Sequence, residues 1–487
     1  MAVAQLTLDP AYTIAPVDRR LFGSFVEHMG RCVYTGIFEP GHPSADADGL
    51  RGDVLDLVRE LGVTTVRYPG GNFVSGYRWE DGVGPRGDRP RRLDLAWRAL
   101  ESNAFGLNEF MRWSSLAGVE PMMAVNLGTR GIEAAAELVE YCNLAEGTAA
   151  SDLRRKHGVA QPHDVRLWCL GNEMDGPWQI GSLTADEYGR LAARAGHAMR
   201  RVDPSIELVA CGSSNSDMPT FAAWEATVLE HAYDQVDYIS LHSYYDPEKH
   251  DEASFRASAV DLDGFIDNVV ATADHVRAKL RRQKRIKLSL DEWNVWYQSR
   301  FTEPEDRAIE ELPALIEDDY NGTDAVVVGN LLISMLRHAD RLTVGAQAQL
   351  VNVIAPIRTR AGGEAWRQTI FHPFAHTARL ARGTVLRPAL TSPDMTTGRF
   401  GEVPSVDAVA THDEESGALT LFLVNRGTEP VPLAVDLRAF PRHRLREHLT
   451  LSAEKPELTS VPMSDGDEIL LPPVSWHALC LTPEESR

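Results

Sequence analysis

The chain has 487 residues, enough to bury a large core and to form two or three domains, or one barrel with a smaller module. Its formal net charge of -21 argues against nucleic acid or an anionic membrane as a partner, because both favour a basic face. A neutral or cationic substrate is easier to accommodate. The five cysteines lack zinc-site spacing and lie mostly in apolar runs, which indicates free thiols in a reducing compartment and no metal site.

The amino-terminal residues 1–20 lack the basic-then-apolar order of a signal peptide. The longest apolar stretch, 325–336, is interrupted by Gly329 and Asn330. We therefore expect a cytoplasmic protein with no membrane partner.

Residues 4–16 alternate between apolar and polar, which predicts an edge strand in a short amino-terminal segment, 1–19. From Phe22 onward, short apolar runs are separated by longer stretches with helical spacing, such as 50–61 and 262–283. The predicted strands are eight: 22–27, 63–67, 121–126, 165–171, 206–211, 236–242, 286–291 and 342–349.

Eight strands that alternate with helices favour an α/β fold, a closed parallel (β/α)8 TIM barrel over residues 20–384. An open doubly wound sheet is the alternative. It is less favoured because no glycine-rich dinucleotide loop follows the first strand, where Gly30 stands alone. No cofactor is predicted.

After about residue 385 the helical pattern stops, and short alternating runs separated by turn residues take over. They predict an antiparallel β-sandwich over 385–487, which the amino-terminal strand is expected to join. The runs are 406–410, 419–425, 431–437, 447–451, 468–471 and 475–481.

Two glutamates follow predicted strands in similar settings, Glu173 after the run 165–171 and Glu292 after 286–290. The carboxyl ends of barrel strands meet at one mouth, and glycoside hydrolysis needs two carboxyl groups there. One protonates the leaving oxygen, and the other attacks the sugar or activates water. A single glutamate of this kind is as often a solvated or salt-bridged loop residue, so the hypothesis depends on the pair.

Other polar residues at strand ends are mostly carboxylates and amides, which suit a ligand with many hydroxyl groups. Asn172 is placed to bind a hydroxyl next to the reacting carbon. His242 could orient a glutamate or satisfy a buried polar site, and Tyr244 could bond the nucleophile or simply pack at the mouth. Large aromatic residues are more often core, so one or two of four tryptophans are expected to line the site: Trp97, Trp178, Trp293 and Trp296.

The chain resembles family 51 of the glycoside hydrolases, the α-L-arabinofuranosidases, from about residue 20 to 385 and more weakly beyond. The resemblance is carried by seven motifs: Phe22-Gly-Ser-Phe-Val-Glu-His28, Arg67-Tyr-Pro-Gly-Gly-Asn72-Phe, Gly106-Leu-Asn-Glu-Phe110, Gly171-Asn-Glu-Met-Asp-Gly-Pro-Trp178, Asp291-Glu-Trp-Asn294, Ala348-Gln-Leu-Val-Asn-Val-Ile354 and Trp366-Arg-Gln-Thr-Ile370.

The resemblance implies that Glu173 is the acid/base and Glu292 the nucleophile of a retaining double displacement. Positions that hold the furanose ring in the family match Glu27, Asn72, Asn172, Tyr244 and Gln349. His242 lies in the matching supporting motif and Trp97 matches a rim tryptophan. Trp296 is a further candidate for sugar binding.

The resemblance also implies a carboxy-terminal jelly-roll and a cytoplasmic homo-oligomer, frequently a hexamer. The expected substrate is an arabinoxylan- or arabinan-derived oligosaccharide, from which the enzyme releases terminal L-arabinofuranose. Another retaining furanosidase, a β-xylosidase on the same barrel and a non-catalytic sugar-binding protein remain alternatives. A retaining mechanism predicts carboxyl groups of Glu173 and Glu292 about 5–5.5 Å apart, against roughly 6.5–9.5 Å for an inverting one.

Overall fold

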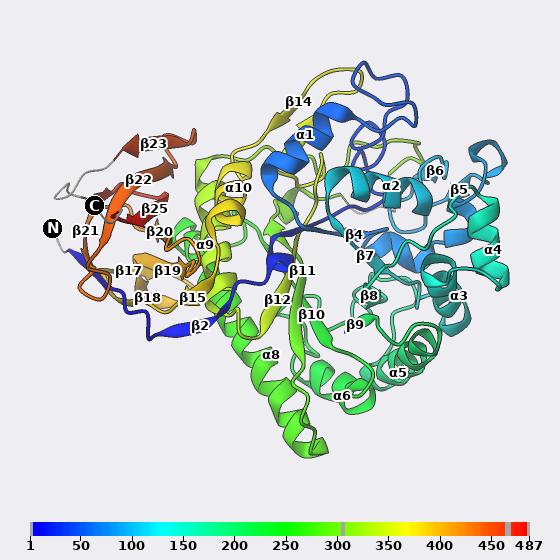
Figure 1. Cartoon of the computed structure of the whole chain (residues 1–487), viewed down its shortest axis with the longest axis horizontal. Coiled ribbons are helices and arrows are strands. Elements are labelled where there is room, and N and C mark those ends of the chain that lie inside the picture. Colours follow the sequence, from blue (N-terminus) through cyan, green and yellow to red (C-terminus); the bar gives the residue numbers. More distant parts are fainter. Residues whose placement is uncertain (1–2, 303–306, 463–468, 485–487) are drawn as a thin grey trace.

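The computed structural model describes residues 3–302, 307–462 and 469–484. Eight parallel strands close into a barrel, on the right in Figure 1, and β12 completes the ring by pairing with β3. The eight predicted strands and the barrel are confirmed. The barrel strands are β3 (Gly23–Phe25), β4 (Thr65–Tyr68), β7 (Glu120–Ala124), β8 (Leu167–Leu170), β9 (Glu207–Ala210), β10 (Tyr238–Tyr245), β11 (Lys287–Val295) and β12 (Leu342–Gln347).

Helices surround this barrel, and their ends carry ordinary capping signals. Helix α5 begins after Thr184, which forms a capping box with Glu187, and α1 ends at Gly62 with a φ of +77°. No helix among the described residues is both long and apolar enough to cross a membrane. The helices are α1 (Gly52–Leu61), α2 (Leu107–Ala117), α3 (Ile132–Asn143), α4 (Ala149–Lys156), α5 (Ala185–Val202), α6 (Ala223–Ala232), α7 (Glu252–Arg256), α8 (Ser258–Leu280), α9 (Gly322–Arg337) and α10 (Phe371–Leu380).

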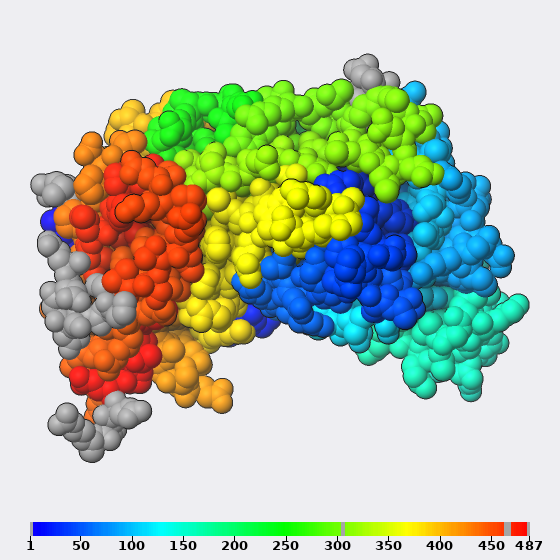
Figure 2. Space-filling model, turned by 90° about the horizontal axis from the view of Figure 1, so that it is seen from above, coloured from blue at the N-terminus to red at the C-terminus, as the bar shows by residue number. Residues whose placement is uncertain are grey.

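The outer ring of helices closes where its first and last members meet. Helix α1 packs against α10, and Glu60 forms an ion pair with Arg367 nearby. In Figure 2 the early residues, coloured blue, accordingly lie beside yellow residues from much later in the chain. Inside the barrel, apolar side chains from several strands fill the centre, among them Met122, Leu167, Val209 and Val344.

A second body, at the left of Figure 1, consists of two β-sheets that share a hydrophobic core. The smaller sheet has the order β16-β1-β21-β24, and the larger has the order β2-β15-β19-β20-β25-β22-β23. The strands are β1 (Ala4–Thr7), β2 (Thr13–Pro16), β15 (Thr384–Leu386), β16 (Ala389–Thr391), β19 (Val406–His412), β20 (Leu419–Asn425), β21 (Val431–Asp436), β22 (His443–Ser452), β23 (Thr459–Pro462), β24 (Ile469–Leu471) and β25 (Ser475–Pro483).

This sandwich differs from the prediction in three ways. The predicted edge strand 4–16 is two strands, β1 and β2, and β1 lies inside its sheet, between β16 and β21. Strand β1 lies parallel to β21, so the sheets are not wholly antiparallel, and the short strands β15, β16 and β23 were not predicted. Residue 468 of the predicted strand 468–471 lies outside the described residues. The division of the chain into 1–19, 20–384 and 385–487 stays a prediction.

Six further short strands among the described residues form three hairpins. The hairpin of β17 (Asp394–Thr397) and β18 (Gly401–Pro404) lies between the sandwich strands β16 and β19 in the chain, but it contacts α7 of the barrel. The others are β5 (Arg92–Leu93) with β6 (Leu100–Glu101), and β13 (Ile357–Thr359) with β14 (Ala365–Arg367).

Helix α9 joins the two bodies by packing against the larger sheet of the sandwich. Gly329 leaves room for this contact, because a Cβ there would lie 2.2 Å from the ring of Trp476. The Asn330 amide donates to the Asp407 carboxylate at 2.8 Å, and Asp407 also pairs with Arg337. The two residues that interrupt the apolar run 325–336 therefore contact the sandwich.

Strands β10 and β11 extend past their predicted ends, residues 242 and 291. Their backbones stay paired from His242 opposite Glu292 to Tyr245 opposite Val295, after a register shift at Ser240. Polar side chains do not interrupt the hydrogen bonds between strand backbones. The change from apolar to polar residues therefore shows where the strand nears the barrel mouth, and the strand itself ends later.

Candidate active site

Glu173 lies just beyond β8 on a strained turn. Its φ of +42° is in the left-handed region that costs an L-residue energy, and such strain is often found at functional sites. The carboxylate accepts a hydrogen bond from Trp178 Nε1 at 2.6 Å and lies 2.9 Å from His242 Nδ1. Burial raises the pKa of Glu173; the hydrogen bond from His242 opposes this shift, and the charge of Glu292 adds to it.

Glu292 lies within β11 and is held by two donors. Arg67 Nη1 donates to Oε1 at 2.6 Å, and the hydroxyl of Tyr244 donates to Oε2 at 2.8 Å. Both donors fix the carboxylate at the mouth of the barrel and stabilise negative charge on it.

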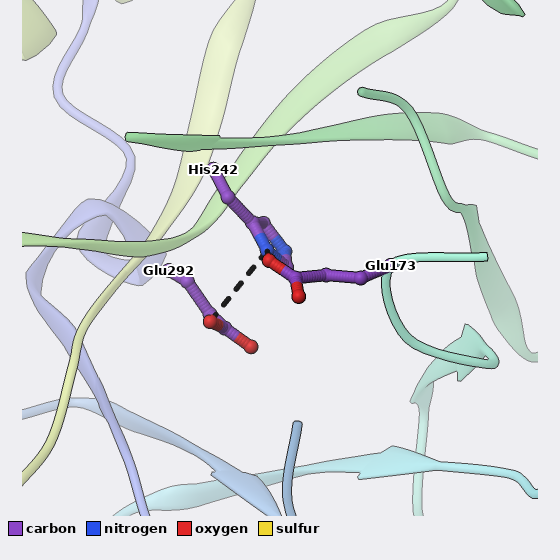
Figure 3. Close-up of side chains that lie close together, drawn as sticks. All are labelled: Glu173, His242 and Glu292. Carbon is purple, nitrogen blue, oxygen red and sulfur yellow. Dashed lines mark hydrogen bonds and ion pairs between the residues drawn. The ribbon is translucent and has the colours of Figure 1, made fainter. Parts of the chain in front are cut away.

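The two glutamates face each other across the mouth. Figure 3 shows them reaching toward the imidazole of His242, Glu292 from β11 and Glu173 from the turn after β8. Carboxylate oxygens of Glu173 and Glu292 lie within 4.8 Å of each other. So close an approach of the two side chains fits the short separation predicted for a retaining pair.

His242 connects both glutamates to a third acid, Asp291. Its Nδ1 lies 3.6 Å from Glu292 Oε2, and its Nε2 lies 3.1 Å from Asp291 Oδ1. Burial lowers the pKa of His242, but the three carboxylates outweigh burial and raise it to about 10. The ring is therefore an imidazolium at neutral pH. Glu173, His242 and Glu292 each bring one possible ligand atom within 4.8 Å of the others, a spacing that could also hold a metal ion.

Arg67 is a buried link between the nucleophile candidate and a sugar-binding candidate. Besides Glu292, it donates through Nη2 to Asn172 Oδ1 at 2.7 Å, and its Nε lies 3.7 Å from Asp291. Asn172 in turn donates to Asn72 Oδ1 at 3.2 Å. The amides of Asn172 and Asn72 are thus oriented by the same guanidinium that holds Glu292.

Glu27 lies opposite these groups, beyond β3. Oε1 accepts from the backbone N–H of Phe73 and from Trp97 Nε1, both at 2.9 Å, and Oε2 accepts from Gln349 Nε2 at 3.1 Å. Burial raises the pKa of Glu27 to about 8, because it outweighs the donors and is reinforced by the charge of Glu292.

Two glycines explain how these carboxylates come so close to the loop after β4. A Cβ on Gly70, whose φ is +154°, would lie 2.5 Å from Glu27 Cγ. A Cβ on Gly71 would lie 2.9 Å from Glu292 Oε1. The Gly-Gly pair therefore allows the backbone to pass against both acids.

These groups border one cavity of about 720 Å³. Eight of the ten predicted site residues line it: Glu27, Asn72, Trp97, Glu173, Tyr244, Glu292, Trp296 and Gln349. Asn172 and His242 do not line it, but they contact residues that do. Three of the four tryptophans reach the cavity, more than the one or two expected, whereas Trp293 is fully buried against Phe374.

Sequence reasoning placed Arg67 and Asp291 at strand ends near the mouth but gave them no role, and it did not indicate the tip of the β17–β18 hairpin, which also lies at the site. Arg67 and Asp291 are 1% exposed in strands, and a charged residue inside an apolar run is a signal that an opposite charge lies nearby. The hairpin reaches the cavity through Arg399 and Phe400. No local pattern in its sequence indicates this contact.

The closed barrel and the paired carboxylates at its mouth define a glycoside hydrolase. Comparisons with known proteins agree with this class. Two family models match, the alpha-L-arabinofuranosidase 1 domain over residues 57–260 and the alpha-L-arabinofuranosidase C-terminal domain over residues 291–468. The chain belongs to family 51 of the glycoside hydrolases, the α-L-arabinofuranosidases.

Two relatives and one solved structure illustrate the similarity. An intracellular exo-alpha-(1->5)-L-arabinofuranosidase of Streptomyces lividans is 57% identical over 98% of this chain and 73% of its own length. Its Bacillus subtilis counterpart is 52% identical over 99% of both chains. The structure of a family 51 α-L-arabinofuranosidase from Bifidobacterium longum covers 99% of both chains at 46% identity, with a TM-score of 0.93.

Proposed function

We propose that this protein is a retaining, exo-acting α-L-arabinofuranosidase that releases terminal L-arabinofuranose from arabinan- or arabinoxylan-derived oligosaccharides. The short separation of Glu173 and Glu292 carries the proposal. Glu292 attacks the anomeric carbon while Glu173 protonates the departing oxygen, which leaves a glycosyl-enzyme ester. Glu173, now ionised, takes a proton from water as the water attacks the same carbon, and Glu292 leaves. Two inversions restore the original configuration.

The surroundings of the two acids fit these different roles. Burial and the negative charge of Glu292 favour the protonated form of Glu173, as a general acid requires. Arg67 and Tyr244 direct two donors at Glu292, which hold its oxygens in place for attack. His242, a cation in contact with both, stabilises the negative charge of Glu292 and that of Glu173 once Glu173 has given up its proton.

The furanose ring would be held by Glu27, Asn72, Asn172 and Gln349. Since the pKa of Glu27 is raised to about 8, its carboxyl group can donate a hydrogen bond to a sugar hydroxyl as well as accept one. Asn172 follows β8 directly, next to the proposed acid, and suits the hydroxyl beside the reacting carbon. The tryptophans Trp97 and Trp296 supply apolar surface around the ring.

The names of the relatives bear on linkage and location. Several are called intracellular exo-α-(1→5)-L-arabinofuranosidases, and one from Bifidobacterium longum is called an exo-α-(1→6)-L-arabinofuranosidase. We therefore propose an intracellular enzyme that prefers α-(1→5)-linked arabino-oligosaccharides. A homo-oligomer, a hexamer by resemblance to the family, is also proposed, and the molar mass in solution tests it.

A panel of nitrophenyl glycosides tests the activity. The α-L-arabinofuranoside should be cleaved far faster than the galactofuranoside and the xylopyranosides, and NMR should show the α-anomer of arabinose as the first product. Preference for the xyloside would favour a β-xylosidase. Sugar binding without hydrolysis of any substrate would mean a binding protein, and a β-anomer as first product would exclude the double displacement.

A further inference from the structure

The catalytic cavity continues away from Glu173 and Glu292 to the β17–β18 hairpin. Arg399 and Phe400 at the hairpin tip line it together with residues of the loops that follow β9 and β10, such as Asn215 and Lys249. One wall of the cavity thus comes from a segment that precedes the sandwich strand β19, whereas the proposed furanose site is built from barrel residues alone.

The hairpin tip is fixed to the barrel by several contacts. The backbone N–H of Arg399 donates to Ser254 Oγ at 3.0 Å, and its guanidinium donates to Asp261 Oδ1 at 2.8 Å. Asp261 also accepts from the Tyr245 hydroxyl at 3.2 Å. A Cβ on Gly398 would lie 2.5 Å from an oxygen of Asp251, so the tip sits directly on the start of α7. These contacts form a defined wall.

The chemistry of this wall suits a neutral ligand. Its two cations are each paired: Arg399 with Asp261, and at 3.6 Å with Asp217, and Lys249 with Asp217 at 3.0 Å. Paired charges give little net attraction for an acidic ligand. Ser214, Asn215 and Ser216 add hydroxyl and amide groups, and Phe400 and Phe255 add aromatic surface. Hydrogen-bonding groups beside aromatic rings match a sugar, which has hydroxyl groups at its edge and an apolar face.

The cavity is larger than a single sugar would fill. Even at the ~30 Å³ that a water molecule takes in the liquid, the ten or so heavy atoms of a pentose fill only about 300 Å³. The cavity holds about 720 Å³, so more than half remains once the furanose is bound.

We propose that the β17–β18 hairpin forms the binding site for the leaving-group sugars, the second and following units of a neutral pentose oligosaccharide, with Phe400 as the surface on which one of them stacks. This inference rests on the proposed function. It makes the hairpin a determinant of chain-length preference, while the chemistry stays with the barrel residues.

The test compares Phe400→Ala with the wild type on two kinds of substrate. Methyl α-L-arabinofuranoside has no leaving-group sugar, so kcat/KM should change less than about twofold. For α-(1→5)-arabinobiose and arabinotriose, loss of an aromatic contact should lower kcat/KM by roughly two- to tenfold. Arg399→Lys, which keeps the charge but not the forked geometry, should show the same selective loss.

Thr396→Ala is the matched control, because Thr396 lies on the same hairpin, bonds only to Glu402 across it, and does not line the cavity. Equal losses on the methyl glycoside and the oligosaccharides, or no loss on either in both variants, would overturn the inference. If the wild type cleaves none of the arabinofuranosides, the proposed function itself fails, and that outcome is distinct from an active enzyme whose hairpin variants behave normally.

Discussion

Replacing Glu173 by alanine separates the roles of the two glutamates. The change should leave the fold intact, because the groups that contact Glu173 can form hydrogen bonds with other partners. His242 keeps its contact with Asp291, and the indole of Trp178 is 49% exposed and can bond to water. Glu173→Gln, which keeps the size and loses the acid, is the matched control. Circular dichroism and a melting curve check that both variants are folded.

The expected loss depends on the leaving group. General acid catalysis contributes about 10²–10⁴-fold, or roughly 2.7–5.4 kcal/mol of barrier, when the departing oxygen needs a proton. Arabinobiose should therefore lose at least that much. Dinitrophenyl arabinofuranoside needs no proton, so Glu173→Ala should form the glycosyl-enzyme readily, release about one equivalent of dinitrophenol in a burst, and then stall for lack of a base.

Azide distinguishes the roles further, because it attacks without a base. It should restore turnover in Glu173→Ala and give arabinofuranosyl azide with the configuration of the substrate. Glu292→Ala cannot form the ester, so azide could only displace the leaving group directly, with inversion. NMR of the products decides the matter: an inverted azide from Glu173→Ala, or a retained one from Glu292→Ala, would mean that the roles are exchanged.

Three further predictions follow from individual contacts. Tyr244→Phe removes the 2.8 Å hydrogen bond to Glu292 and should lower kcat/KM by roughly ten- to a hundredfold, since bonds to charged groups contribute about 1.5–3 kcal/mol. A loss below about twofold would show that Tyr244 does not position the nucleophile. The pKa of Glu27 is raised from 4.5 to about 8. Between these pH values the folded protein holds a proton that the unfolded chain has lost. The stability of the wild type should therefore fall as the pH rises from about 4.5 to about 8 and level off above that. The side chain in Glu27→Gln does not titrate. Urea denaturation should therefore show that its free energy of unfolding rises relative to that of the wild type by up to a few kcal/mol between about pH 5 and about pH 8.5. A difference that stays constant with pH would contradict the raised pKa of Glu27. Asp407→Ala leaves the buried Arg426 without that nearby acid and should cost about 3–5 kcal/mol of unfolding free energy. Asp436→Ala breaks only a pair with the exposed Arg438 and should leave the melting temperature nearly unchanged.

The positions of the catalytic candidates could be predicted because a parallel barrel buries both faces of its strands. Such strands appear as continuous apolar runs, and the first polar residues after each run, such as Asn172 and Glu173, mark the mouth. The same reasoning placed the ends of β10 and β11 too early. Hydrogen bonds between backbones continued through His242 and Glu292, and side-chain polarity carries no information about those bonds.

The partners of the site residues could not be predicted in the same way. The sequence shows that Arg67 lies in an apolar run, but not that it reaches Glu292 from 225 residues away. Asp291 was known only as a neighbour of Glu292, and its contact with His242 depends on the register between two strands. The approach of Arg399 to the cavity depends on how the sandwich docks on α9, which no local pattern determines.

Strand β1 lies between β16 and β21 and pairs with both, although these strands come more than 380 residues later in the chain. During synthesis on the ribosome, residues 4–7 therefore have no sheet to join until residues 389–391 and 433–436 have been made. Strand β1, which carries apolar side chains, therefore stays unpaired while the whole barrel is synthesised. The smaller sheet of the sandwich can assemble only near the end of translation. Figure 1 shows the amino-terminal strands, in blue, together with β25 in the sandwich beside the barrel. Removing the first sixteen residues would therefore take one strand from each sheet of the sandwich.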